Sequence, residues 1–176
     1  MDKNIETRLL PFSLTLLVVA LDQLTKWIVT MTIKPWSVGA AFFGDILRLV
    51  RVYNPGIAFS IGGDLSGDIR GVLFGLMPLV VIFVVVFVYF RSKDLNGFQR
   101  WCIAGIVGGG LGNLIDRFFR PDGVLDFIDV KFYGLFGFER WPTFNVADSA
   151  VVVCGILLMV SLFRSVKQAG AEEADK

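Results

Sequence analysis

The 176-residue chain contains no histidine and only two cysteines, and these scarcities exclude several kinds of active site. Without histidine, neither a Ser-His-Asp site nor a Cys-His site can form. A zinc site would have only two cysteines as soft ligands, so we expect no metal and no cofactor. Cys102 and Cys154 each lie within an apolar run, where free cysteine usually packs as a small hydrophobic side chain.

An excess of charge of either sign is also missing, because 17 lysines and arginines stand against 16 aspartates and glutamates. The chain has no basic tract, which argues against nucleic acid as a partner. Apolar side chains are abundant instead and make up 55% of the residues. A soluble domain of this size has more polar residues, so the composition indicates a membrane protein if the apolar residues are grouped into spans.

Four apolar stretches are long enough to cross the hydrocarbon core of a bilayer, which takes about 20 residues of helix. They cover approximately residues 9–30, 71–90, 102–119 and 146–163. The first stretch continues past Asp22 and Lys26 to Val29. We therefore expect a retained helix, because the apolar run of a cleaved signal peptide has only about 7–15 residues. The predicted fold is an all-α membrane protein with four transmembrane helices in a single domain over residues 1–176.

Lysine and arginine predict the orientation of these helices, since they concentrate in cytoplasmic loops. With four spans, both termini share a side with the short link between the second and third helices. That side has the higher density of basic residues. We therefore expect both termini in the cytoplasm and two long outer loops, at about 31–70 and 120–145.

The outer loops contain segments that resemble strands. Residues 46–53 alternate apolar with basic side chains, 54–56 supply an Asn-Pro-Gly turn, and 57–61 resume the pattern. This arrangement predicts a β-hairpin or a small extracytoplasmic sheet with one apolar face. Residues 124–130 predict a further strand. The aromatic residues that follow suit either an amphipathic segment at the membrane interface or a surface that faces the substrate. They are Phe136, Phe138, Trp141 and Phe144.

Polar side chains within the predicted helices gather toward one side of the membrane. Asp22 and Lys26 are four residues apart, so they share a helix face and can pair. Because the helices alternate in direction, the other polar side chains also lie near the outer leaflet, and Asp126 follows the third helix on that side. These others are Asn113, Asp116, Arg117, Asn145, Asp148 and Ser149. Ionisable residues inside a membrane are costly, so their convergence predicts a functional site.

Two aspartates that share one proton are the leading route to hydrolysis in a chain without histidine. Carboxylates a few ångströms apart cannot both ionise easily, so one polarises the scissile carbonyl while the other takes a proton from water. Asp22 and Asp116 have basic neighbours and are expected to be structural. Asp126 and Asp148 lack such neighbours, which makes them the candidate pair. Asp129 lies near Asp126 in the sequence. Asp148 also suits a capping role, because it lies in the first turn of its helix.

The third predicted helix is rich in glycine, at positions 105, 108, 109, 110 and 112. These glycines form small-xxx-small pairs that allow a neighbouring helix to approach closely. Close packing of this kind would hold the polar groups in a fixed geometry.

At these residues the sequence resembles the bacterial lipoprotein signal peptidases, also called signal peptidase II. The match covers nearly the whole chain, and its motifs occur in the expected order. They are residues 22–26 (DQLTK), 53–59 (YNPGIAF), 112–117 (GNLIDR), 124–128 (VLDFI) and 144–148 (FNVAD). One departure is Ile57, where members of the family often have a smaller residue; it affects the loop over the site but leaves the catalytic assignment unchanged.

The resemblance implies an aspartic endopeptidase of the bacterial inner membrane, with Asp126 and Asp148 as its catalytic residues. Such an enzyme removes signal peptides from prolipoproteins by cleaving before a cysteine that bears a diacylglyceryl group. Supporting positions carry over to Asp22, Lys26, Asn54, Gly56, Asn113, Arg117 and Asn145. The resemblance further implies an active site near the outer leaflet, contact with membrane lipids and inhibition by globomycin-type compounds. A single helix bundle with its own site makes a monomer sufficient.

Three other functions stay open at the level of sequence. A proton-coupled transporter also uses membrane aspartates, although it predicts polar residues through the full depth of the bundle and a repeated half. A Ser–Lys hydrolase would use Lys26 with Ser149 or Ser60. A packing or scaffold protein would not depend on its aspartates. The aspartate pair itself predicts a bell-shaped pH dependence of activity and no effect of metal chelators.

Overall fold

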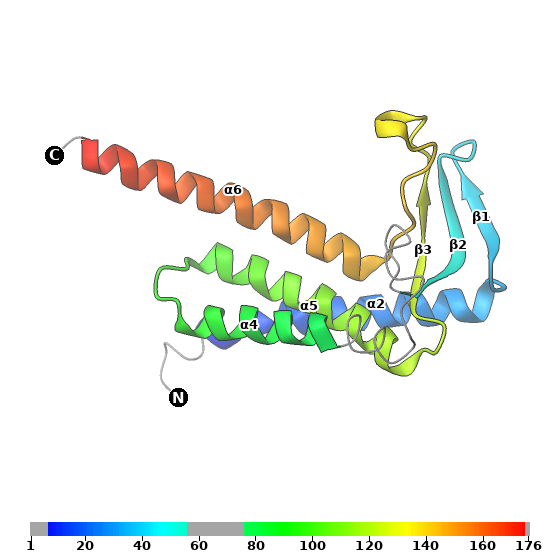
Figure 1. Ribbon diagram of the computed structural model, residues 1–176, viewed down its shortest axis with the longest axis horizontal. Helices are drawn as coiled ribbons and strands as arrows, with labels where there is room; N and C mark the ends of the chain where they lie inside the picture. The colour runs from blue at the N-terminus through cyan, green and yellow to red at the C-terminus, as the bar shows by residue number, and fades with distance from the viewer. Residues whose placement is uncertain (1–6, 56–75, 175–176) are drawn as a thin grey trace.

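The computed structural model describes residues 7–55 and 76–174. Figure 1 shows the helix axes roughly aligned with one another, with a small sheet across one end of the bundle. The start of α2 and the end of α6 lie at the opposite end. The elements in chain order are α2 (Phe12–Thr32), β1 (Ser37–Phe42), β2 (Leu47–Asn54), α4 (Met77–Arg91), α5 (Gly97–Phe119), β3 (Val124–Val130), the short 3-10 helix η3 (Leu135–Gly137) and α6 (Val146–Ala174).

Within the described residues, three helical segments are long and apolar enough to cross a membrane. They are Thr7–Thr32, Gly97–Phe119 and Val146–Gln168. Helix α4 is apolar as well but has only 15 described residues, and residues 71–75, where the sequence places its start, lie outside the described part. Large apolar side chains cover the outer faces of the helices, for example Leu16, Phe83 and Val152, each more than half exposed. Such faces are suited to contact with lipid.

Helix α5 is the central helix of the bundle. In the most apolar stretch of α5, 61% of the residues are buried, compared with 28% in that of the α2 segment and 6% in that of α6. It begins five residues earlier than the sequence predicted, because Asn96 and Gln99 form a capping box that hydropathy alone does not detect. Its glycines lie where neighbouring helices approach closely: a Cβ at Gly109 would lie 2.3 Å from the carbonyl oxygen of Ala147 on α6. The predicted role of these glycines in close packing is thus confirmed.

The sheet is antiparallel in the order β1-β2-β3, with β2 in the centre. The strands predicted at 46–53 and 124–130 are both present. The hairpin is not where the sequence placed it, because β2 pairs with the preceding β1 through a turn at residues 43–46. Strand β1 was missed since its sequence, SVGAAF, contains a glycine and does not alternate. Residues 56–61, predicted to complete the turn and a further strand, lie outside the described residues.

Strand β3 is fixed to the C-terminal end of α2 by a small hydrophobic cluster. Its buried members are Val29 from α2 and Leu125 and Phe127 from β3. Leu125 is fully buried, which places the neighbouring Asp126 at the junction between sheet and bundle. The sheet therefore serves to hold one polar residue against the ends of the helices.

Candidate active site

Asp126 and Asp148 come from different elements that meet at the end of the bundle covered by the sheet. Asp126 lies in β3 and is 3% exposed, while Asp148 lies in the first turn of α6 and is partly buried. The chain returns to β3 just before α6 starts: the amides of Phe127 and Ile128 donate to the carbonyl of Phe144 at 3.1 and 2.8 Å. This pairing brings the beginning of α6 beside Asp126.

Asn145 links the two aspartates. Its Nδ2 donates to Asp126 Oδ1 at 2.8 Å, and its Oδ1 accepts from the backbone amide of Asp148 at 2.9 Å. The backbone amide of Asn145 donates in return to Asp148 Oδ2 at 3.1 Å. This reciprocal pair is a capping arrangement for α6. The capping role that the sequence suggested for Asp148 therefore exists, but it uses only one of the two carboxylate oxygens.

Asn113, from α5, binds the other oxygen of Asp148. Its Nδ2 donates to Asp148 Oδ1 at 2.7 Å. Its Oδ1 accepts from Asn145 Nδ2 and from Lys26 Nζ, both at 3.0 Å. Asn113 is 9% exposed and Asn145 is fully buried. Buried amides keep hydrogen-bond partners, so these contacts give the site a single well-defined arrangement.

A buried ion cluster lies on the far side of Asn113 from Asp148. Lys26 Nζ is 2.8 Å from Asp22 Oδ2 and 2.9 Å from Asp116 Oδ2, and all three side chains are fully buried. Asp116 also contacts Arg120 Nε at 3.0 Å. Buried charges are tolerated when they are paired in this way, and removal of one partner is costly. The pairing of Asp22 with Lys26 was predicted from their spacing.

Arg117 does not pair with Asp116, contrary to the expectation from sequence. Neighbouring residues on a helix do not face each other, so Asp116 takes Lys26 and Arg120 as partners instead. The charge of Arg117 acts on Asp148 and Asp126. Its Nε is buried and has no hydrogen-bond partner among the described residues.

Asn54 approaches Asp126 from the end of β2. Its Nδ2 lies 3.5 Å from Asp126 Oδ2, at the long limit of a hydrogen bond. Gly56, which the resemblance also implicated, and Ser60, the alternative nucleophile, lie outside the described residues, as does Ile57.

The environment of Asp126 favours its protonated form. Burial, and after it the negative charge of Asp148, raises the pKa of Asp126 to about 7, against the opposing hydrogen bonds from Asn54 and Asn145. A carboxyl group with this pKa is available both as an acid and as a base near neutral pH, which is the property required of a hydrolytic pair.

An apolar groove of about 380 Å³ reaches Asp148 itself. Two aromatic side chains, Trp141 and Phe144, line it on the side of the β3–α6 connection. The first turns of α6 line the other side with Ser149, Val152 and Val153. A ligand with hydrocarbon groups would thus lie directly beside a carboxylate.

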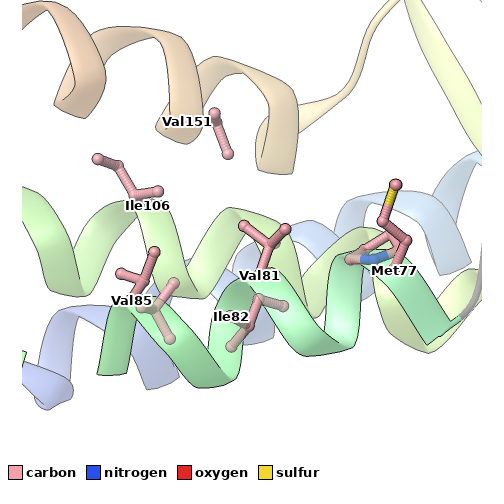
Figure 2. A pocket seen from close by; sticks show the side chains of 9 residues that line it. Met77, Val81, Ile82, Val85, Ile106 and Val151 are labelled. Carbon is pink, nitrogen blue, oxygen red and sulfur yellow. The ribbon is translucent and has the colours of Figure 1, made fainter. Parts of the chain in front are cut away.

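A second apolar groove, of about 290 Å³, lies between α4, α5 and α6. Figure 2 shows Val81, Ile82 and Val85 of α4 below Ile106 of α5 and Val151 of α6. Val151 is three residues beyond Asp148, so the two grooves lie on either side of the beginning of α6.

Lys26 and Ser149, the described residues considered for a Ser–Lys hydrolase, do not form a site together. Lys26 is held between two aspartates, while a Ser–Lys hydrolase needs a neutral lysine beside its serine. Ser149 Oγ donates instead to the carbonyl of Asn145 at 2.9 Å. Across the described ranges, no three His, Cys, Asp or Glu side chains are grouped as metal ligands would be.

Two residues of the cluster were missed from sequence. Gln23 Nε2 lies 3.1 Å from Asp22 Oδ2, from Asp116 Oδ1 and from the carbonyl of Gly112. Arg120 pairs with Asp116, four residues earlier on α5, and this spacing was the available signal. No local pattern indicated Gln23, because two of its three partners, Asp116 and Gly112, lie on another helix.

Comparison with known proteins gives a consistent result. Residues 14–164 match the model of a family described as signal peptidase (SPase) II. The lipoprotein signal peptidase of Treponema pallidum (strain Nichols) is 48% identical over 89% of this chain and 84% of its own length. That of Treponema denticola is 48% identical over 90% of this chain and 92% of its own. That of Borreliella burgdorferi (strain ZS7) is 44% identical over 79% and 81%.

Solved structures agree with these relatives. Two bacterial membrane enzymes superimpose with TM-scores of 0.75 and 0.73, at 28% and 29% sequence identity. The matches cover 90% and 86% of this chain, and 90% and 91% of the solved chains.

Proposed function

Because this chain belongs to the signal peptidase II family, we propose that Asp126 and Asp148 are the catalytic pair of a lipoprotein signal peptidase. The enzyme is a membrane peptidase that removes signal peptides from prolipoproteins. The alternative of a proton-coupled transporter is not supported by the family or by these relatives.

The observation that supports the catalytic assignment best is the bridge through Asn145, which hydrogen-bonds to both aspartates. In the proposed reaction one aspartate takes a proton from water while the resulting hydroxide attacks the scissile carbonyl carbon. The other aspartate gives its proton to the carbonyl oxygen. The first aspartate then passes its proton to the departing nitrogen, which breaks the C–N bond. The second aspartate takes a proton back from a hydroxyl of the tetrahedral intermediate, so the pair returns to its starting state with one proton.

We assign supporting roles to the residues around the pair. Asn113 and Asn145 hold the carboxylates, the Asp22–Lys26 pair secures Asn113 from behind, and Arg117 offers its buried Nε to the substrate backbone. Asn54 and, by resemblance, Gly56 border the site from the first outer loop.

The substrate is proposed to be a prolipoprotein cleaved before its diacylglyceryl-modified cysteine. The groove beside Asp148 supports this class of substrate, because it is apolar and opens among exposed apolar residues of α6. The site lies at the end of the bundle opposite to the start of α2 and the end of α6 (Figure 1). This placement fits four spans with both termini in the cytoplasm of a bacterium, and a site near the outer leaflet of the inner membrane.

The aromatic segment, the inhibitors and the number of copies also belong to the proposed function. The aromatic segment between β3 and α6, where the ring centroids of Phe132 and Trp141 lie 5.0 Å apart, suits the membrane interface. Globomycin-type inhibitors would occupy the site of the lipidated substrate. The chain would act as a single domain and needs no second copy, since both aspartates come from one chain.

The test is cleavage of a diacylglyceryl-modified prolipoprotein by the purified protein in lipid, with the products identified by mass. We expect one cut on the N-terminal side of the modified cysteine and much slower cleavage of the same precursor without its lipid. Proton-driven solute uptake by proteoliposomes without any cleavage would contradict the proposal.

A further inference from the structure

We infer that Lys26 is a positioning residue that sets the direction of the hydrogen bonds in the catalytic pair: through Asn113 it keeps Asp148 ionised and leaves the shared proton on Asp126. This inference rests on the proposed function. It assigns Asp148 as the group that takes the proton from water and Asp126 as the group that protonates the carbonyl oxygen.

The first step concerns the ammonium group of Lys26, which has three N–H donors and no acceptor. Three oxygens surround it: Asp22 Oδ2 at 2.8 Å, Asp116 Oδ2 at 2.9 Å and Asn113 Oδ1 at 3.0 Å. Every donor therefore has one acceptor in a fully buried site. The amide of Asn113 cannot reverse without placing its NH2 group against this ammonium, so its oxygen must face Lys26.

The second step follows from the geometry of an amide, whose oxygen and nitrogen lie on opposite sides of the same carbon. With Oδ1 turned to Lys26, Asn113 Nδ2 faces Asp148 Oδ1 at 2.7 Å. This nitrogen can only donate, so Asp148 Oδ1 must accept. Asp148 Oδ2 accepts from the backbone amide of Asn145 at 3.1 Å. Hydrogen bonds donated to both oxygens favour the carboxylate form of Asp148.

The third step fixes the state of Asp126. The backbone amide of Asp148 donates to Asn145 Oδ1 at 2.9 Å, which turns Asn145 Nδ2 toward Asp126 Oδ1 at 2.8 Å. Asp126 Oδ1 is thus an acceptor. Among the described residues its Oδ2 receives only the 3.5 Å contact from Asn54 Nδ2, so it is the oxygen where a proton meets least competition from a donor. The proton of the pair belongs there.

Burial and the charge of Asp148 raise the pKa of Asp126 more than the hydrogen bonds and the charge of Lys26 lower it, so the proton stays on Asp126. Within the described part of the chain, Arg117 of α5 acts on both aspartates, Lys26 of α2 acts on Asp126, and the two aspartates act on each other. Asp22 and Asp116 lie beyond Lys26, which pairs with both, and Arg120 supplies a second positive charge to Asp116. Lys26 therefore contributes both a positive charge and a fixed amide orientation.

The experiment compares the pH dependence of kcat/KM for the wild type, a Lys26→Met/Asp22→Asn double variant and a matched Asp22→Asn variant. The double variant removes one buried charge of each sign, keeps an oxygen for the amide of Ala147 and leaves Asp116 paired with Arg120. It removes one of the two donors to Asn113 Oδ1 and leaves only Asn145 Nδ2, so the acid limb of the profile should move up by about one pH unit. The basic limb, set by Asp126, should move less.

The Asp22→Asn variant keeps Lys26 and its bond to Asn113, so its acid limb should stay at the wild-type position. A merely structural role for Lys26 would lower the rate at every pH and leave both limbs in place. That result, or the same shift in both variants, would overturn the inference.

Infrared spectroscopy gives a second measurement in case the double variant does not fold. About one pH unit below the pKa of Asp126, the wild type should show the C=O band of a protonated carboxyl group. The band should be lost in Asp126→Asn and kept in Asp148→Asn; the opposite pattern would refute the assignment. Failure of the proposed function is recognised separately, because either the wild type would then not cleave the substrate or both variants would still cleave it.

Discussion

Amide side chains shape the site at the scale of single residues as much as carboxylates do. Asn145 is fully buried, contacts Asp126 through its side chain and exchanges two hydrogen bonds with Asp148. Asn113 joins Asp148 to the ion cluster around Lys26. Amides do not titrate, so they keep the two aspartates in place while the proton moves between them.

A first prediction concerns Asn145→Ala. The variant loses the bond to Asp126 and the cap of α6, so kcat/KM should fall at least about 100-fold. Loss of the cap should also lower the free energy of unfolding by about 1 kcal/mol. Steady-state kinetics and thermal unfolding in the same detergent measure the two effects. Activity within a factor of about three of wild type would show that the bridge is not needed.

A second prediction concerns the pH dependence of activity. The pKa of Asp126 is raised to about 7 by burial and by Asp148, and the carboxyl must be protonated to donate to the substrate. Activity should therefore be lost as pH rises through about 7. Activity should also be lost at low pH, where the other aspartate becomes protonated. The pH dependence of activity should therefore be bell-shaped. A rate that rises steadily with pH across this range would rule out a shared proton.

At the scale of elements, α5 positions the site by its close contact with α6. A Cβ at Gly109 would lie 2.3 Å from the carbonyl oxygen of Ala147, the residue before Asp148. Backbone cannot yield as a side chain can, so this contact fixes the distance between the helix of Asn113 and that of Asp148.

The third prediction compares Gly109→Ala with Gly110→Ala, its neighbour on the same helix. A methyl group at 109 must push α6 away, which should destabilise the protein by about 1–3 kcal/mol. The displacement of Asp148 should lower kcat about 10- to 100-fold. A methyl group at 110 would lie 3.0 Å from Cδ1 of Ile82, a flexible side chain, and should be tolerated. Equal effects of the two variants on kcat would contradict this role of Gly109.

The same scale shows how far sequence could predict the structure. Apolar runs located the helices, and alternation located β2 and β3, because both patterns are local. Strand β1 lacks alternation and was missed, and the start of α5 is set by a polar capping box. The pairing of Asp22 with Lys26 follows from spacing within one helix, whereas the partners of Asp116 and the orientation of Arg117 depend on how α5 meets α2 and α6. The motifs of the resemblance indicated the site residues without showing their contacts.

At the scale of the whole molecule, the sheet closes one end of the helix bundle and the site lies at their junction (Figure 1). The groove beside Asp148 is open among the exposed apolar residues of α6. In the proposed function, a substrate that arrives within the bilayer would thus reach the partly buried Asp148 without crossing a polar surface.

The fourth prediction tests the groove with Val152→Trp. The larger side chain should fill space beside Asp148 and raise KM for the lipidated substrate about tenfold, with a smaller change in kcat, because it removes binding and leaves the pair intact. The control is Val160→Trp, also on an exposed part of α6 but outside the residues that line the groove. A rise in KM of the same size in both variants would indicate a general effect on the membrane helix.

The central claim is that Asp126 and Asp148 act as one catalytic pair. Its most direct test is cleavage of a diacylglyceryl-modified prolipoprotein by wild type, Asp126→Asn and Asp148→Asn, each verified as folded. Asp122→Asn, at an exposed position just before β3, is the matched control. The account predicts that both pair variants lose at least about 1,000-fold in kcat/KM while the control cleaves as wild type does. Near-normal cleavage by either Asp126→Asn or Asp148→Asn would contradict it.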